Sequence, residues 1–267
     1  MCTVILLRRP GHAWPLLLAA NRDERIDRPW DPPGPHWPDR RGVIGGRDRS
    51  AGGTWMAVNR AGVVATVLNR PGSLGPAPGK RSRGELPLIA LDQANARDAV
   101  AAIAALDAGA WRPFNMVIAD AWQAFFVAGL GAGQAEAWAL PEGVSMVTAH
   151  DPNDLASPRI ARHLPRFIAA PAPDPSLGDW ASWEALLGDD GYAPEIGRAE
   201  ALNVPPEGGF GTVSASLLGA ASGGALLWRF APGPAGVVPF ETVALPWAAI
   251  AYPSSSATAI PASPATA

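Results

Sequence analysis

The sequence predicts a single α+β domain built from layered, mainly antiparallel sheets. Strand-like segments dominate both ends of the 267-residue chain, and helical patterns are grouped between them. Neighbouring strands joined by short turns favour antiparallel pairing, and this order of elements is typical of an α+β fold. We expect residues 1–247 to form the domain. Residues 248–267 are mostly Ala, Ser and Pro without periodicity, so we expect a disordered tail there.

Two apolar segments open the chain. Cys2–Leu7 is apolar and partly β-branched, and Leu16–Ala20 follows after a turn that contains Pro, Gly and His. These features predict a β-hairpin. Charged residues and prolines over 21–38, and glycines and arginines over 42–53, predict loops. The next hairpin is predicted to pair Thr54–Asn59 with Gly62–Leu68 across a turn at Arg60–Ala61.

Helical signals are concentrated in the middle of the chain. A capping-box spacing of Ser and Glu over 82–85 precedes the apolar residues 86–91, and the alanine-rich segment 95–106 has apolar residues at helical spacing. A Ser-Pro pair predicts the start of a helix over 157–170, with His163 on its polar, solvated side. The remaining strands are predicted at Phe114–Ala119, Ala124–Gly129, Ala135–Leu140, Thr212–Leu218, Ala225–Phe230 and Val238–Leu245.

Composition and charge narrow the classes of function. A formal net charge of −3 provides no strong attraction to nucleic acids or anionic membranes. No apolar run approaches the ~18 residues of a membrane span, and no secretory signal is recognisable, which favours a cytoplasmic protein. A single cysteine excludes an intramolecular disulfide framework and an all-cysteine zinc site, and no other metal-ligand spacing is present. We therefore expect neither a metal nor a cofactor.

Cys2 is the first candidate for chemistry. Aminopeptidases remove an initiator methionine before small residues, and removal would leave Cys2 with both a thiol and a free α-amino group. Their ordinary pKa values are about 8.5 and about 8, so one residue can supply both a nucleophile and a proton acceptor. The simpler interpretation is a buried cysteine at the start of a strand.

The polar residues that follow the second strand add to this candidate site. Asn21, Arg22, Asp23 and Glu24 lie at the end of the predicted partner of the Cys2 strand, so the hairpin brings them close to Cys2. A carboxylate there can hold the ammonium group, and Arg22 can lower the pKa of the thiol. The alternative is a strand end with solvated charges.

Asn69 and the tryptophans extend the candidate site. Asn69 follows a predicted strand, and its side-chain amide is a suitable oxyanion-hole donor, although the Pro-Gly after Arg70 also fits a simple turn. Of the 11 tryptophans, Trp30, Trp37 and Trp55 lie near the polar motifs, and some can line an apolar pocket beside Cys2. Trp55 is the tryptophan expected to contact a substrate.

Taken together, these motifs resemble the NRDE family, also called the Transport and Golgi organisation 2 family, in order and spacing over roughly residues 1–247. The resemblance implies a four-layer αββα sandwich of the N-terminal nucleophile hydrolase type. It is more remotely similar to the cysteine amidases that cleave bile salts and penicillin V, which implies roles for Cys2, Asp23 and Asn69. Asn21, Arg22 and Glu24 stay candidates beside Asp23. The motifs are Met1-Cys2, Ala19–Glu24, Gly52–Trp55, Asn69, Arg83–Leu86, Asn115–Asp120 and Gly211–Ser216.

Two positions depart from these relatives. His150 stands where the amidases have a second functional asparagine, and Val213 stands where relatives have an arginine. His150 is accordingly a candidate substrate-binding residue, and a Cys2–His150 dyad is a further alternative.

Two functions of different classes follow. The first is a cysteine amidohydrolase that acts on a linear amide or acyl compound. The second is a non-catalytic carrier, because the resemblance links the family to haem handling and to lipid or acyl-CoA metabolism. In both cases the expected partner is a small molecule.

Overall fold

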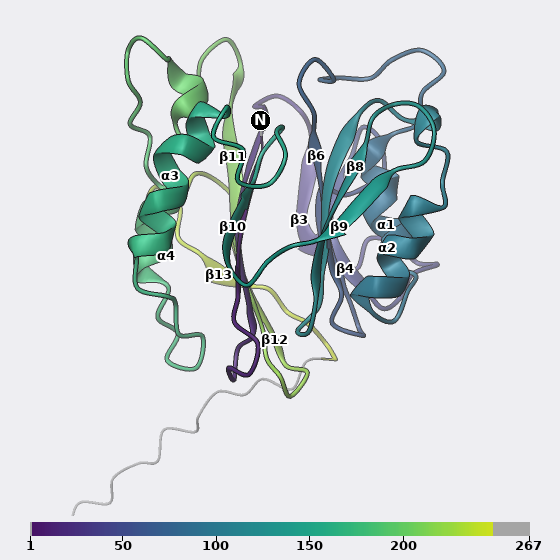
Figure 1. The fold of residues 1–267 in the computed structure, drawn as a ribbon, viewed down its shortest axis with the longest axis horizontal. Helices are drawn as coiled ribbons and strands as arrows, with labels where there is room; N and C mark the ends of the chain where they lie inside the picture. Colours follow the sequence, from purple (N-terminus) through teal and green to yellow (C-terminus); the bar gives the residue numbers. More distant parts are fainter. Residues whose placement is uncertain (1, 248–267) are drawn as a thin grey trace, which may run out of the picture.

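The computed structural model describes residues 2–247. The predicted tail at 248–267 and the state of Met1 lie outside these residues. Two antiparallel sheets stack face to face between two layers of helices, which gives the predicted αββα order (Figure 1). No helix within residues 2–247 is long and apolar enough to cross a membrane.

Cys2 precedes an interior strand of the first sheet, sheet A. Its spatial order within the described residues is β10 (Gly143–Val147), β1 (Thr3–Arg8), β2 (Leu16–Arg25), β11 (Phe210–Ala220), β12 (Leu226–Ala231) and β13 (Glu241–Thr242). Sheet B follows the chain order: β3 (Trp30–Gly34), β4 (Val43–Asp48), β5 (Met56–Asn59), β6 (Val64–Asn69), β7 (Phe114–Ala119), β8 (Ala124–Gly129) and β9 (Glu136–Ala139).

Alternate side chains along each strand point to opposite faces of the sheet, so one strand contributes to two different hydrophobic cores. In β1, Val4 and Leu6 point into the space between the sheets, where they pack with Val58 and Phe126 of sheet B. Ile5, between them, points to the opposite face and packs against helices. Burying one large apolar side chain contributes roughly 1.5–3 kcal/mol, so both faces of the strand hold it in register.

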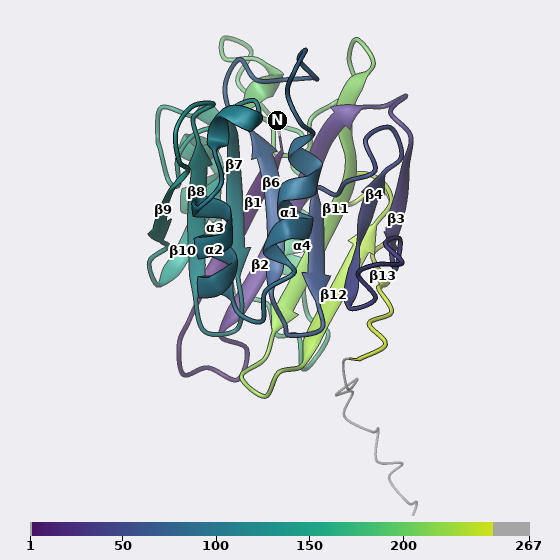
Figure 2. The same cartoon turned by 90° about the vertical axis from the view of Figure 1, so that its right-hand side faces the viewer.

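Four helices form the outer layers: α1 (Leu86–Ala90), α2 (Ala96–Ala104), α3 (Pro158–Ala169) and α4 (Ala181–Leu187). Helices α1 and α2 cover sheet B, which is seen face-on in Figure 2, and α2 buries Ile103 against that sheet. Helices α3 and α4 cover sheet A, with Phe167 and Trp183 in that core.

The loop predicted over 21–38 is wrong at two places, because β2 continues to Arg25 and β3 covers Trp30–Gly34. Strand β11 runs beside this part of β2 and pairs Thr212 with Asp23, so the ladder satisfies the backbone groups of polar residues. Strand β10, which the sequence pattern missed, pairs along the other side of β1.

The loop predicted over 42–53 contains β4. Its glycines are required by packing between strands rather than by a turn. A Cβ atom at Gly45 would lie 2.4 Å from that of Ala57, and one at Gly46 would lie 2.2 Å from the Trp55 ring. Only glycine permits these approaches.

The solvated position predicted for His163 is also wrong. The His163 side chain lies on the buried side of α3 and is completely buried, and its Nε2 lies 3.1 Å from the carbonyl oxygen of Glu200. Burial, assisted by the positive charge of Arg166, lowers the pKa of His163 to about 4. Apolar residues lie on both sides of this helix, since Ile160 is buried and Ile168 is exposed, so the sequence pattern did not separate its buried side from its solvated side.

Candidate active site

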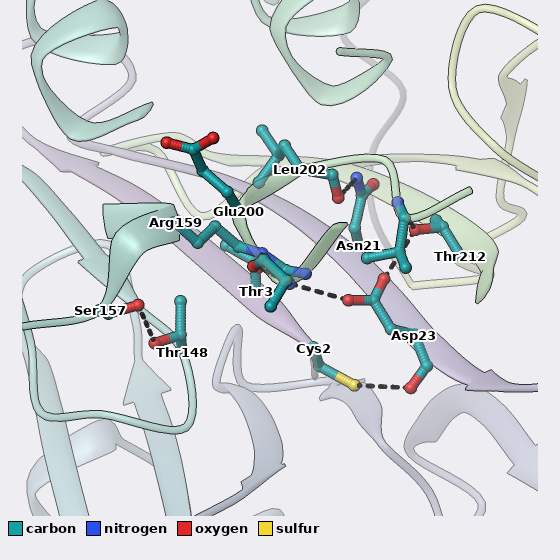
Figure 3. A network of polar contacts seen from close by, with 12 residues as sticks. Cys2, Thr3, Asn21, Asp23, Thr148, Ser157, Arg159, Glu200, Leu202 and Thr212 are labelled. Carbon is teal, nitrogen blue, oxygen red and sulfur yellow. Dashed lines mark hydrogen bonds and ion pairs between the residues drawn. The ribbon is translucent and has the colours of Figure 1, made fainter. Parts of the chain in front are cut away.

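Cys2 lies at the end of the β1–β2 ladder, facing the space between the sheets. Thr3 pairs with Asn21, which sets Cys2 beside Arg22 on the neighbouring strand. The side chain packs against the core between the sheets. Its Sγ lies 3.7 Å from the backbone carbonyl oxygen of Asp23 (Figure 3).

Strand alternation divides the four polar residues 21–24 between the two faces of sheet A. Asn21 and Asp23 point toward α3 and α4: the Nδ2 of Asn21 donates to the carbonyl oxygens of Leu187 and Leu202, at 2.9 and 3.0 Å. Arg22 and Glu24 point the other way, toward a cleft between the sheets. The sequence alone left all four as equal candidates.

The Asp23 carboxylate is held by a buried network behind Cys2. Nη1 of Arg159 on α3 lies 2.8 Å from Oδ2 of Asp23 and 2.9 Å from the Thr3 hydroxyl, and Thr212 Oγ1 donates to Oδ1 of Asp23 at 2.7 Å (Figure 3). The Asp23 and Arg159 side chains are 0% and 2% exposed. This network connects the two strands that carry Cys2 and Arg22 to the helical layer.

Arg22 is a buried cation on the cleft side. Its side chain is 5% exposed, and its guanidinium lies 4.1 Å from the centroid of the Trp55 ring and 3.9 Å from a carboxylate oxygen of Glu24. Within residues 2–247, its Nη1 has no hydrogen-bond partner. A desolvated donor without a partner costs free energy, so a ligand acceptor at this atom would be strongly favoured.

The cleft has a volume of about 700 Å³, within the usual range for small-molecule sites. Cys2, Arg22, Trp55 and Asn69 all line it. Asn69 is the last residue of β6, opposite Phe114, and its side chain makes no hydrogen bond with the described part of the chain. Its amide is therefore available to a ligand in the same cleft as the thiol.

His150 is not among the residues that line this cleft. Its Nδ1 lies 3.1 Å from Oδ2 of Asp154, and its backbone carbonyl accepts a hydrogen bond from Asn115. The structure thus brings Cys2 together with Asn69 and Trp55 but assigns the His150 imidazole a partner in its own loop.

Two residues of the Asp23 network were missed from the sequence. Thr212 lies in the Gly211–Ser216 motif, which was the available signal, and its place opposite Asp23 on β11 is known only from the structure. Arg159 follows the Ser-Pro start of α3 and resembles any helix-surface arginine in the sequence. Only the packing of α3 on sheet A reveals its role.

The Cys2 thiol itself differs from the sequence-based expectation of a lowered pKa. Burial raises the pKa of the thiol, and the positive charges of the amino terminus and, to a smaller extent, of Arg22 offset this only in part. The thiol is accordingly protonated at neutral pH in this form of the chain.

We expect iodoacetamide to alkylate Cys2 more slowly than free cysteine at pH 7, because thiolate is the reactive species. The rate should rise with pH through and beyond the ordinary thiol pKa of about 8.5. Arg22→Gln should slow labelling further, since Arg22 lowers the pKa of this thiol. Arg97→Gln, an exposed change on α2, is the matched control. A labelling rate that levels off below about pH 8 would contradict the expectation.

Comparison with known proteins agrees with this geometry. The sequence model for Transport and Golgi organisation 2 matches residues 1–153, more than half of the chain. The chain belongs to the Transport and Golgi organisation 2 family. No curated protein matches the sequence.

Solved structures similar to this family member are N-terminal nucleophile hydrolases. A Caenorhabditis elegans orthologue of N-acylethanolamine-hydrolyzing acid amidase aligns with a TM-score of 0.54 and 13% identity, over 81% of this chain and 92% of the other. The R18L variant of the conjugated bile acid hydrolase of Clostridium perfringens aligns with a TM-score of 0.52 and 12% identity, over 91% and 92%. These likenesses show the N-terminal nucleophile hydrolase fold predicted from the sequence.

Proposed function

We propose that this protein is a cysteine amidohydrolase of the N-terminal nucleophile type, acting on a linear amide or acyl compound. The observation that carries the proposal is that Cys2, Arg22 and Asn69 line one cleft between the sheets. A nucleophile directly before β1, a cation on β2 and an amide donor at the end of β6 are then available to one substrate carbonyl group.

In the proposed reaction, removal of Met1 frees the α-amino group of Cys2. As the sulfur attacks the substrate carbonyl carbon, the amine takes the thiol proton and passes it to the leaving nitrogen as the C–N bond breaks. Water then attacks the resulting thioester, which releases the acid and restores the thiol. Because the amine accepts the proton during attack, a thiol that is protonated at rest is compatible with this mechanism.

The neighbouring residues have separate roles in this proposal. The Asn69 amide donates to the carbonyl oxygen as negative charge develops. Arg22, with its unpartnered Nη1, stabilises the same charge or the thiolate. Asp23 positions the amine of Cys2, and Trp55 supplies an apolar wall. Glu24 and Asn21 have structural roles in this proposal. Glu24 lies near Arg22, and the Asn21 side chain connects β2 to backbone carbonyl groups by hydrogen bonds.

Two of the similar structures support the choice of an amide as substrate. One is an acid amidase that hydrolyses N-acylethanolamines, and the other hydrolyses conjugated bile acids.

A non-catalytic carrier of an acyl metabolite is the second candidate, and the size of the cleft, about 700 Å³, suits it equally well. Such a protein would use the cleft to hold a ligand without cleaving it. Haem is a weaker candidate for this cleft. No histidine is among the described residues that line it, and the raised pKa of the Cys2 thiol disfavours the thiolate that would bind the iron.

The proposal is tested by comparing amide turnover by the wild-type protein with turnover by the Asn69→Ala variant. We expect the wild-type protein to hydrolyse members of a panel of N-acyl amides and Asn69→Ala to reduce kcat by about 10²–10³ fold. Iodoacetamide labelling of Cys2 should be unchanged in this variant, which separates oxyanion stabilisation from thiol reactivity. The carrier would be favoured if the wild-type protein lacks Met1, as measured by intact mass, and binds acyl amides without cleaving any of them.

A further inference from the structure

The cleft that contains Cys2 carries an excess of positive charge. Seven basic residues and three acidic residues line it, although the whole chain has a net charge of −3. The basic residues are Arg22, Arg25, Arg28, Lys80, Arg81, Arg83 and Arg112, and the acidic residues are Glu24, Asp48 and Asp23, whose carboxylate points away from the cleft toward Arg159. A cleft lined by one sign of charge concentrates ligands of the opposite sign.

Four of these basic residues have a carboxylate within 4 Å. Arg25 pairs with Asp27, Arg28 with Asp48, and Arg81 with Glu85, and Arg22 has Glu24 at 3.9 Å. Lys80, Arg83 and Arg112 have no such partner among residues 2–247. These three cations therefore account for the unbalanced charge of the cleft.

Backbone carbonyls, rather than acids, hold these three side chains in position. Nη1 of Arg83 donates to the carbonyl oxygens of Ser73 and Pro113, at 2.7 and 3.1 Å. Arg112 donates to the carbonyl oxygens of Leu74 and Gly72, at 2.5 and 2.7 Å. Lys80 donates to the carbonyl oxygen of Gly109. Carbonyl groups orient the cations without neutralising them.

Arg83 retains donors for a ligand. Its three hydrogen bonds all use Nη1, and within the described chain its Nε and Nη2 make none. These two nitrogens form the edge of a guanidinium that binds two oxygens of one oxyanion. Burial, and then the nearby charge of Arg112, lower the pKa of Arg83 to about 10. Two guanidinium groups repel each other there, and an anion between them would relieve the repulsion.

We propose that Lys80, Arg83 and Arg112 form an oxyanion subsite that binds a phosphate group carried by the substrate. The inference rests on the proposed function, since it places this group in the same cleft as the carbonyl group beside Cys2. A phosphate monoester carries about −1.5 to −2 charges at pH 7 and three acceptor oxygens, which suits three cations better than a singly charged carboxylate. The substrate class is then an acyl or amide compound with a phosphorylated end.

Binding of inorganic pyrophosphate, measured by calorimetry at low salt, tests the subsite without any turnover. Arg83→Gln and Arg112→Gln should each weaken binding about tenfold or more, because a charge-assisted hydrogen bond is lost. Arg97→Gln removes the same charge from the exposed side of α2 and should leave binding within about twofold. Acetate should bind far more weakly than pyrophosphate.

A second pair of variants keeps the test decisive if loss of Arg112 loosens the loop that it holds. Leu74 is 54% exposed and lines the cleft, and its carbonyl oxygen accepts from Arg112. Leu74→Glu should weaken pyrophosphate binding, whereas Leu74→Gln should not. Cys2→Ala should bind pyrophosphate as tightly as the wild type does, because the thiol is not part of the oxyanion subsite. Pyrophosphate binding therefore tests the subsite independently of amide hydrolysis. No binding by the wild type, equal loss in Arg97→Gln, or acetate binding as tight as that of pyrophosphate would overturn the subsite.

Discussion

Cys2→Ala is expected to abolish amide turnover, with kcat reduced by at least about four orders of magnitude, as loss of a covalent nucleophile typically does. The change removes the one thiol of the chain, which lines the cleft. Alanine is also small, so Met1 removal and the free α-amine should be preserved. Steady-state kinetics on the best N-acyl amide of the panel, together with intact mass for both proteins, measure this.

Trapping of the intermediate provides the control for this result. The wild type should gain one acyl mass on Cys2 when the reaction is quenched early, and Cys2→Ala should gain none. Turnover by Cys2→Ala above about 1% of the wild-type rate would exclude Cys2 as the nucleophile, because removal of a true nucleophile costs far more than hundredfold.

Arg159→Met is expected to lower the free energy of unfolding by about 3–5 kcal/mol, the usual cost of removing one member of a buried ion pair. Methionine keeps much of the length of the side chain but removes the hydrogen bonds to Asp23 and Thr3. The Asp23 carboxylate is fully buried, so water cannot readily replace the lost cation. Urea unfolding followed by fluorescence of the buried tryptophans measures the change.

Arg162→Met on the same helix is the matched control. Its ion pair with Glu200, at 3.4 Å, involves an arginine that is 34% exposed, and the buried Glu200 carboxylate keeps a hydrogen bond from the backbone N–H of Ala193 at 2.6 Å. Its loss should therefore cost clearly less than the loss of Arg159. The double variant Asp23→Leu/Arg159→Met should recover part of the loss, because it removes both members of the buried ion pair. Equal destabilisation by Arg159→Met and Arg162→Met would show that the buried network does not stabilise the fold.

Strands with a clear pattern of hydrophobic residues were predicted correctly from the sequence. Phe114–Ala119 and Ala124–Gly129 have the bounds of β7 and β8, and the hairpin that begins after Cys2 is β1 with β2. Here local hydrophobicity and turn residues determine the structure, because each strand pairs with the next in the chain. The same local motifs identified the family and the fold.

The sequence by itself therefore determined the four-layer fold, the family and the position of Cys2 beside the polar residues 21–24. Tertiary structure alone decided which of those residues face the cleft, that β2 continues past Asn21, and that Arg159 lies buried against Asp23. The last two of these features depend on partners more than 130 residues away, β11 in the ladder and α3 over the sheet. No local pattern encodes such contacts, because the side chains meet only after the sheet and its helices have packed.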